Sequence, residues 1–317
     1  MIADPQRGHL LWSRDEQEAF QRVEEFRAMS LTDNAGGYMV PFQLDPAVIL
    51  TSAGSINPLR RISRVVTATG DTWHGVSSEG VTAEWIAEAT EVADATPTLA
   101  QPEVPVHKGD AFVPYSFEVG MDAVDLLGEL GPLLTDAADQ LQASAFTTGS
   151  GTGQPTGIIK ALDGTTSEVA PAVAEVFGSA DVYALQNALP PRFQARAQWC
   201  ANIAIINSAA QFETTNGARL FPEIGDGRLL RKPLNELSNM DGAINAAATA
   251  DNFVLLYGDF SHFVIADRIG TTLEPIPNLF GANRRPTGQR GAFLWFRTGS
   301  DSVADNAFRL LNVATTA

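Results

Sequence analysis

The fold is decided at residues 149–158, Gly149-Ser150-Gly151-Thr152-Gly153-Gln154-Pro155-Thr156-Gly157-Ile158. A glycine run of this kind invites a phosphate-loop interpretation, but it contains no Gly-Lys-Ser/Thr and no strict GxGxxG pattern. Pro155 also removes one of the backbone N–H donors that a phosphate cradle uses. The stretch is therefore predicted to be a glycine-rich connector after a long helix.

That long helix is predicted over residues 119–147. Apolar residues recur there three or four positions apart, which is the spacing of one helix face. Pro132 fits either as a first-turn residue of a second helical segment or as a kink. The stripe consists of Val124, Leu127, Leu130, Leu134, Ala138, Leu141 and Ala145. We expect it to anchor a sheet.

A long hairpin is predicted before the helix, over residues 62–118. Strand-like ends at Arg61–Thr69 and Val104–Glu118 enclose an acidic stretch without helical periodicity. Between Asp71 and Asp110 there are eight acidic residues and one basic residue, Lys108. Such a charge balance disfavours burial in the chain's own core. An ordinary solvated loop is the alternative, although about 40 residues is long for a loop within one domain.

The N-terminal part, residues 1–61, is predicted to form an arm. A capping-box pattern at Ser13 and Glu16 followed by apolar residues at helical spacing predicts a helix over about 14–29. The prolines at 41, 46 and 58 then favour extended chain. Because such an arm buries little of its own surface, we expect it to lie on a partner.

The second half mixes strands and helices without strict alternation, so the predicted fold class is α+β. Helices are expected near 179–189 and 208–216, on either side of a strand at Trp199–Ile206. Further strands are expected at 253–257, 261–267, 271–276, 291–298 and 306–313.

Composition and charge exclude several classes of protein. No apolar run reaches the roughly 18 residues that a membrane span requires, and the first 14 residues lack the pattern of a secretory signal. A single cysteine, Cys200, permits neither a disulfide nor a cysteine zinc cluster within one chain. The net charge of −16 is concentrated in residues 1–150, which argues against specific recognition of nucleic acid.

No catalytic, metal-binding or cofactor-binding constellation is found, so the chain is not predicted to be an enzyme. The four histidines, at 9, 74, 107 and 262, lie far apart and form no HExxH pattern. No GxSxG marks a nucleophile elbow. The carboxylates of the first half are scattered without a motif that pairs an acid with a base.

One charge pattern stands out near the C-terminus, where Asn283–Arg290 contains three arginines. The segment is either a solvated loop or the receptor for the acidic hairpin of a neighbouring chain, where complementary charge would fix the register. The candidate contacts between subunits are Glu79, Glu84, Trp85, Glu88, Glu91, Asp94, Arg284, Arg285 and Arg290.

Several short motifs, in this order and spacing, resemble the major capsid proteins of tailed bacteriophages, which have the Hong Kong ninety-seven type of shell fold. The resemblance runs from about Arg14 to Val313. The motifs that carry it are Gly36-Gly37-Tyr38-Met39-Val40-Pro41, Ala87-Glu88-Ala89, Val106-His107-Lys108, the connector 149–158 and Gly258-Asp259-Phe260.

The resemblance implies a capsid subunit with five named parts. These are an N-terminal arm at 1–61, an extended-loop hairpin at 62–118, a spine helix at 119–147, a peripheral domain at 110–165 and 263–317, and an axial domain at 170–262. The implied function is structural. A compartment of the encapsulin type, which holds cargo enzymes, is the alternative.

The resemblance also implies partners. Copies of the chain would assemble into hexamers and pentamers, in the host cytoplasm, and close into an icosahedral virion capsid around double-stranded DNA, contacted non-specifically. A portal, and a scaffolding protein or segment, are further implied partners, and no membrane is. Some family members cross-link a hairpin lysine with help from a buried glutamate. Here Lys108 lies at the hairpin base and Phe293–Phe296 contains no glutamate, so no cross-link is expected.

Overall fold

The computed structural model describes residues 2–3, 10–11, 15, 50–78, 80–122 and 126–316. The chain divides into two compact units, 1–48 and 49–317. In the first unit, β1 (Ile2–Ala3) pairs antiparallel with β2 (Leu10–Leu11). The helix expected over 14–29 and most of the arm at 1–61 lie outside the described residues.

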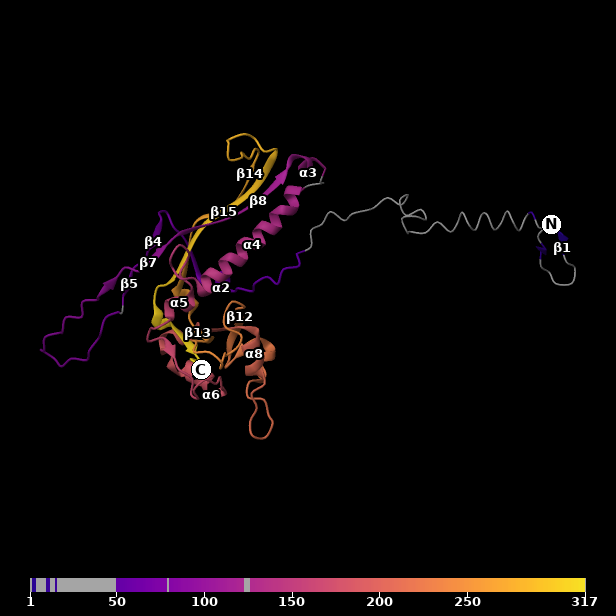
Figure 1. Cartoon of the computed structure of the whole chain (residues 1–317). Coiled ribbons are helices and arrows are strands. Elements are labelled where there is room, and N and C mark those ends of the chain that lie inside the picture. The colour runs from indigo at the N-terminus through magenta and orange to yellow at the C-terminus, as the bar shows by residue number, and fades with distance from the viewer. Residues whose placement is uncertain are drawn as a thin grey trace. The chain divides into compact units, whose positions relative to one another are not determined.

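The second unit is built on two sheets (Figure 1). The six-stranded sheet has the order β11-β12-β10-β13-β16-β9, and the four-stranded sheet has the order β3-β14-β15-β8. The strands of the first are β11 (Arg228–Leu229), β12 (Lys232–Glu236), β10 (Gln198–Ala201), β13 (Phe253–Gly258), β16 (Phe308–Asn312) and β9 (Glu168–Val169). Those of the second are β3 (Arg64–Thr67), β14 (Phe263–Ile276), β15 (Gln289–Ser302) and β8 (His107–Ser116).

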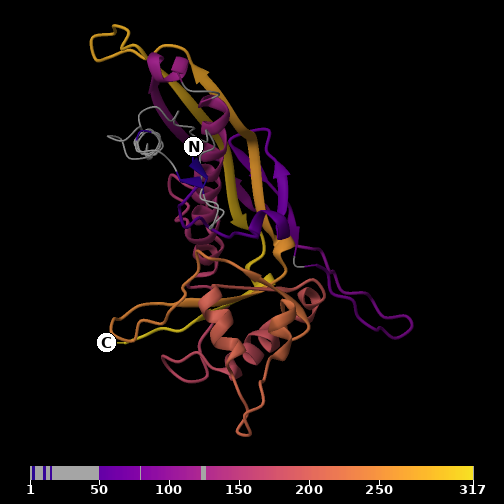
Figure 2. The same ribbon diagram turned by 90° about the vertical axis from the view of Figure 1, so that its right-hand side faces the viewer.

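A long helix, α4 (Leu126–Thr148), runs along the four-stranded sheet (Figure 2). It follows the short helix α3 (Phe117–Asp122), and Pro132 lies inside it. Leu134 and Ala138 of the expected apolar stripe are buried against β15 residues. The helix therefore anchors the sheet as the periodicity of its apolar residues predicts.

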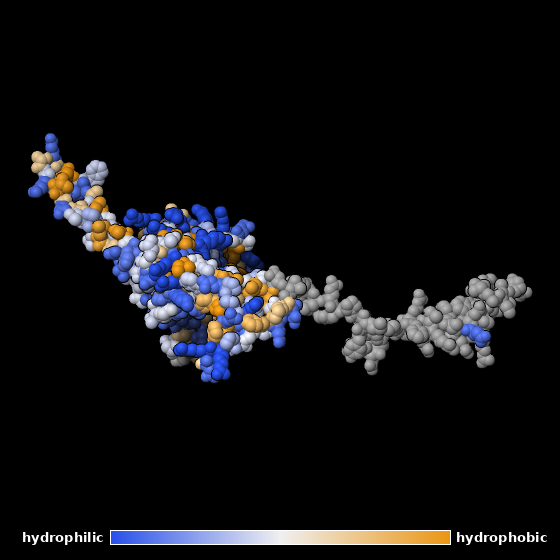
Figure 3. Space-filling view, turned by 90° about the horizontal axis from the view of Figure 1, so that it is seen from above, coloured by the Kyte–Doolittle hydropathy of each residue, from blue (hydrophilic) through white to orange (hydrophobic). Residues whose placement is uncertain are grey.

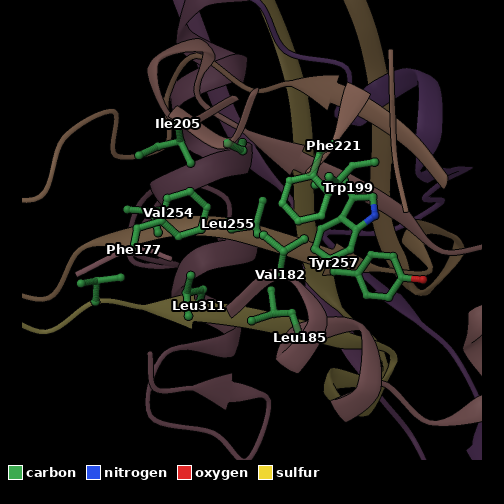
Figure 4. Close-up of a cluster of buried hydrophobic side chains, with 14 of the residues drawn as sticks. Phe177, Val182, Leu185, Trp199, Ile205, Phe221, Val254, Leu255, Tyr257 and Leu311 are labelled. Carbon is green, nitrogen blue, oxygen red and sulfur yellow. The ribbon is translucent and has the colours of Figure 1, made fainter. Parts of the chain in front are cut away.

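The core of the six-stranded body is aromatic and aliphatic (Figure 4). Trp199 of β10 stacks on Tyr257 of β13, with ring centroids 4.1 Å apart. Side chains from two helices, α6 (Ser179–Ala188) and α8 (Ile203–Ala210), complete the cluster. A second cluster joins α5 (Ile158–Leu162) to the start of β14 and to β16. The remaining helical pieces are α2 (Leu59–Ile62), α7 (Pro191–Gln194), η3 (Pro222–Asp226), η4 (Phe260–His262) and η5 (Asp305–Ala307).

Two expected boundaries in this body are wrong. The strand expected at Trp199–Ile206 ends at Ala201, and the helix expected at 208–216 is instead α8, which ends at Ala210. The reason is Asn202, whose side-chain oxygen accepts a hydrogen bond of 3.0 Å from the Ala204 N–H and so caps a helix start. An apolar run of this length is ambiguous between strand and helix, and the cap decides it.

The C-terminal strands also differ from expectation. The strands expected at 261–267 and 271–276 are one strand, β14, with register shifts between Asp267 and Thr272. The last strand, β16, pairs with β13 and β9, so it lies in the six-stranded sheet. A division that groups all of 263–317 with 110–165 therefore cuts through this sheet.

The expected hairpin at 62–118 has a different base. Its two end strands do not pair with each other, because β3 pairs with β14 and β8 pairs with β15, at opposite edges of the four-stranded sheet. The hairpin itself begins further in. There β4 (Thr72–His74) pairs with β7 (Glu103–Pro105), and β5 (Ser77–Ser78) pairs with β6 (Leu99–Ala100).

Candidate functional site

The glycine-rich connector is a tight turn whose glycines are required by close backbone approach. A Cβ on Gly149 would collide with the carbonyl oxygens of Pro155 and Ala145, and one on Gly157 would lie 2.5 Å from the Gly149 nitrogen. Gly151 and Gly153 have φ of +77° and +71°, which side-chain-bearing residues rarely adopt. The turn thus lets the chain double back at the end of α4.

The same turn is fastened to β15. The Thr156 N–H donates to the Ser300 carbonyl at 3.1 Å, and the Ser300 hydroxyl donates to the Thr156 carbonyl at 2.7 Å. Within the turn, Gln154 donates to the Ser150 hydroxyl. These bonds fix the end of the long helix on the sheet, which gives the connector a structural role in positioning.

A second fastening point is Arg60 of α2, which sequence reasoning missed. Its guanidinium makes a two-pronged ion pair with Asp267 of β14, at 2.7 and 3.0 Å, and its Nε donates to Gln142 of α4 at 2.9 Å. Although burial opposes it, hydrogen bonds from Arg60 and Thr298 hold the pKa of Asp267 below its ordinary value. Cavities of about 250 and 160 Å³ lie beside Arg60 and Gln142. Arg60 therefore ties α2, β14 and α4 together beside two small cavities.

The hairpin beyond β5 and β6 is exposed along its described length (Figure 3). Trp85 has 105% of its reference surface exposed, and Val81, Ile86 and Val92 are exposed there as well. Val76, just before β5, and Leu99, in β6, are also exposed. Of the expected contact residues, Glu84 accepts a hydrogen bond from the Ala93 N–H and Asp94 accepts two from Thr96. Glu88 and Glu91 are exposed, and Glu79 lies outside the described residues. This arrangement leaves apolar surface without cover from its own chain.

The arginine-containing segment is the loop between β14 and β15, which we call the tip loop (residues 277–288). It is ordered by backbone hydrogen bonds, such as Leu279 N–H to the Gln289 carbonyl at 2.9 Å. Arg284 and Arg285 are exposed. Arg290 differs, since it belongs to β15 and its guanidinium lies 4.9 Å from the centre of the Phe117 ring. The loop therefore presents two exposed cations, and the third is engaged by an aromatic ring.

Within one chain the hairpin and the tip loop are held apart by β8. His107, next to the hairpin, pairs with Thr298, whereas Ser116 at the other end pairs with Gln289, next to the tip loop. Ten residues of β8 at about 3.4 Å each separate the two ends by roughly 30 Å. Among the residues that the structure describes, no ion pair joins the hairpin acids to Arg284, Arg285 or Arg290. Contact between them requires a second copy.

The surroundings of Lys108 differ from the sequence argument in one respect. Its ammonium pairs with Asp110 at 2.9 Å and lies 5.3 Å from the centre of the Phe293 ring. The strand 291–298 itself has no carboxylate, but β14 places Glu274 directly opposite Phe293, where it accepts a hydrogen bond of 3.1 Å from Trp295. The neighbouring strand thus supplies an acid that the linear sequence does not show.

We nevertheless expect no covalent cross-link. Lys108 is held by Asp110 within its own sheet, and it is the one lysine in the hairpin region. Boiling assembled material in detergent and running a denaturing gel should give one band near 33.8 kDa. A ladder of higher bands that disappears in Lys108→Arg would contradict this expectation.

Asp301, at the end of β15, is a part-buried carboxyl with a raised pKa. Burial raises its pKa to about 6 against a lowering by the Ser302 N–H, and the Asp305 carboxylate raises it further. In the unfolded chain an aspartate ionises near pH 4. Folding is therefore favoured by the neutral form, and this contribution is present below about pH 4 and lost as the pH rises through about 6.

Replacing Asp301 with Asn should remove this penalty. We expect the free energy of unfolding at pH 7 to rise by about 1 to 2 kcal/mol, after a discount for the partial exposure of the group. At pH 3.5 the gain should be near zero. Urea unfolding at the two pH values measures the difference, with Asp305→Asn as a control of smaller effect. An equal gain at both values would assign the effect to something other than ionisation.

The described residues offer no evident reaction centre. No group of three or more His, Cys, Asp or Glu among them is placed to hold a metal ion. Burial raises the pKa of the Cys200 thiol far above its usual range, so it has no thiolate character. No helix in the described part of the chain has the length and apolar character needed to cross a membrane.

The structure is a two-sheet body with a long exposed hairpin whose apolar side chains lack cover from their own chain, as expected of a subunit that assembles with neighbours. Comparison with known sequences agrees. Residues 36–313 match the phage capsid family, and the chain belongs to that family. None of the curated proteins matches the chain.

Solved structures share the fold. The capsid of an empty GTA particle is 24% identical, with a TM-score of 0.74, and the match covers 88% of this chain and 97% of that one. The capsid of a native GTA particle is 23% identical, with a TM-score of 0.77 and coverages of 90% and 99%. A chain of Mycobacterium phage Ogopogo is 18% identical, with a TM-score of 0.63 and coverages of 87% and 98%.

These findings confirm the predicted α+β capsid fold and its function. The protein is a structural subunit of a phage capsid, and it is therefore a component of the virion. The encapsulin alternative is not favoured.

Proposed function

We propose that the chain assembles with copies of itself into hexamers and pentamers that close into an icosahedral shell around double-stranded DNA. The observation that carries the proposal is the hairpin between β5 and β6, whose apolar side chains, Trp85 above all, are exposed in the single chain. Exposed apolar surface of this kind marks an interaction site. The GTA particle capsids that share this fold support a role in a shell.

We assign the two bodies of the second unit to the roles that the capsid fold implies. The body around the six-stranded sheet is the axial domain, and it includes β16. The body around the four-stranded sheet and α4 is the peripheral domain, and the strands at 72–105 begin the extended-loop hairpin. The arm at 1–61 would lie on a neighbouring copy, except for its last residues, since Ile56, Asn57 and Arg60 bond to their own chain.

The contact that we propose between neighbours joins the hairpin acids to the tip loop. Glu84, Glu88, Glu91 and Asp94 of one copy, together with Glu79, would approach Arg284 and Arg285 of the next. Each exposed ion pair contributes only about 0.2 to 1 kcal/mol, but a closed shell repeats every contact many times. Trp85 would add apolar contact with the neighbouring copy. Arg290 would add a third positive charge next to the tip loop, where the Phe117 ring holds its guanidinium.

Charge reversal in the tip loop tests this contact. Arg284→Glu with Arg285→Glu should lower the yield of shells, because like charges then face each other across the contact. Reversing Glu88 and Glu91 to Lys in the same chain should restore part of the yield. Sedimentation velocity measures the yield of shells. The melting temperature of the wild-type shell should also be lower at high salt, because salt screens exposed ion pairs.

The matched control is Glu213→Lys with Asp226→Lys, a reversal of two exposed acids of the six-stranded body that lie away from the hairpin. It should leave assembly unchanged. Normal assembly of the tip-loop reversal alone, or melting of the shell that does not depend on salt, would make the tip loop a solvated turn.

We further propose that a portal and a scaffolding protein or segment take part, that assembly occurs in the host cytoplasm, and that the subunit performs no catalysis. Negative-stain microscopy of the expressed chain, with and without a scaffold, tests the shell. Nuclease protection and the absorbance ratio of purified particles test whether the shells contain DNA. Protein cargo without nucleic acid would contradict the proposal.

A further inference from the structure

Four arginines gather on the six-stranded body, and we call them the basic corner: Arg192, Arg196, Arg228 and Arg231. Arg192 belongs to α7 and Arg196 follows it closely, while Arg228 and Arg231 belong to the β11–β12 hairpin. All four are exposed. None forms an ion pair or a side-chain hydrogen bond with another described residue.

Hydrogen bonds hold the two segments of the basic corner side by side. The Lys232 ammonium donates to the Gln194 carbonyl and, at 3.2 Å, to the Ala195 carbonyl, which fixes the β11–β12 hairpin to the end of α7. Gln186 of α6 donates to the Leu230 carbonyl at 3.4 Å. The four arginines therefore project from a rigid platform, and a fifth cation, Lys232, fastens it.

The turn that carries Arg231 is in a costly conformation. Leu230 and Arg231 have φ of +46° and +67°, in a two-residue connection where Asn and Gly are the usual residues. Leu230 packs against the core of the six-stranded body, which holds the turn in place. Arg231 is therefore retained at the exposed tip of the turn in spite of the backbone strain. Strained backbone of this kind is found more often at functional sites than elsewhere.

The corner is positive in an acidic protein. Residues 191–232 contain six Lys or Arg and three Asp or Glu, a net charge of +3, so the rest of the chain carries −19 and the whole chain −16. A polyanion that approaches the six-stranded body is therefore attracted at the corner. Guanidinium groups bind phosphate through two parallel hydrogen bonds, which favours arginine at such a site.

We propose that the basic corner contacts the phosphate backbone of the enclosed double-stranded DNA, without sequence preference. This inference rests on the proposed function, which supplies the DNA, and it requires that the corner face the interior of the shell. The acidic hairpin of a second copy is the competing occupant. Each chain has one hairpin, and the proposed contact between neighbours assigns that hairpin to the tip loop.

Fluorescence anisotropy of a labelled duplex of about 30 base pairs, titrated with the unassembled full-length protein at about 50 to 200 mM salt, tests the proposal. Arg192→Glu with Arg231→Glu should weaken binding by about tenfold or more, and the slope of log affinity against log salt should shrink by about 0.9 for each phosphate that is no longer neutralised. The matched control, Arg284→Glu with Arg285→Glu, has the same change of charge at the tip loop and should bind DNA as the wild type does.

The outcomes separate this inference from the proposed function. An equal loss of affinity in both variants, or no loss in the corner variant, overturns the inference. A corner variant that fails to form shells but keeps the wild-type salt slope makes the corner a contact between copies, which also overturns it. Failure of the wild-type protein to form shells in microscopy concerns the proposed function alone. If the glutamate variant unfolds, Arg192→Gln with Arg231→Gln should show a smaller loss of affinity in the same direction.

Discussion

Replacing residues 79–98 with an Asn-Gly turn should abolish shell formation and leave the subunit folded. The replacement joins Ser78 to Leu99, which already pair across β5 and β6, and Asn-Gly suits a two-residue hairpin. Among the deleted residues, those that the structure describes, 80–98, bury almost nothing in their own chain, so the melting temperature of the unassembled subunit should stay within a few degrees of the wild type. Circular dichroism and sedimentation velocity measure the two effects.

A substitution at Trp85 separates the apolar from the charged contribution of the hairpin to shell formation. Trp85→Ala removes a side chain that is fully exposed in the single chain, so any loss of assembly reports contact with a neighbour. Large aromatic residues dominate protein interfaces, and truncating one commonly costs about 2 kcal/mol or more. Val173→Ala, at an apolar side chain exposed elsewhere in the chain, is the matched control.

For the shortened chain, in which Asn-Gly replaces residues 79–98, shells of normal yield and stability would show that the hairpin has no part in assembly.

The elements of the fold were predicted correctly from the sequence where the local pattern of residues was unambiguous. The apolar stripe of α4 has one period over many residues, and the acidic stretch between Asp71 and Asp110 has no helical pattern, so both were found. The prediction for the short apolar run after Trp199 was wrong, because the run contains both the end of a strand and the start of a helix. The side chain of Asn202 caps that helix and marks the boundary between the two. Pairing between distant strands was also missed, since nothing in residues 306–313 specifies β13 as their partner.

The candidate site was predicted less completely. The exposed hairpin and Arg284 and Arg285 follow from charge and composition, although their contact with a neighbour stays a prediction. Arg60 could not be found, because its partners Gln142 and Asp267 are 82 and 207 residues away in sequence. Glu274 was missed for the same reason, since it reaches Trp295 from the paired strand. Such contacts depend on the sheet register, which periodicity does not supply.

Gly149→Ala should give the largest loss of stability of any substitution proposed for the folded body. The new Cβ would meet two carbonyl oxygens of the backbone, and neither can move like the end of a flexible side chain. Overpacking typically costs about 1 to 3 kcal/mol, and more where backbone must shift. The damage would also spread, because the same turn fastens α4 to β15 through Thr156 and Ser300. We therefore expect a fall of about 3 kcal/mol or more in the free energy of unfolding.

Gly157→Ala provides a second test of the same turn, since its Cβ would lie 2.5 Å from the Gly149 nitrogen. The control is Gly131→Ala, inside α4, where an added Cβ meets nothing within 4 Å. Alanine favours the helix there, so this variant should gain up to about 1 kcal/mol. Urea unfolding of the unassembled chain compares the three. If Gly149→Ala is as stable as Gly131→Ala, the connector tolerates side chains, and its glycines do not explain how the long helix is set on the sheet.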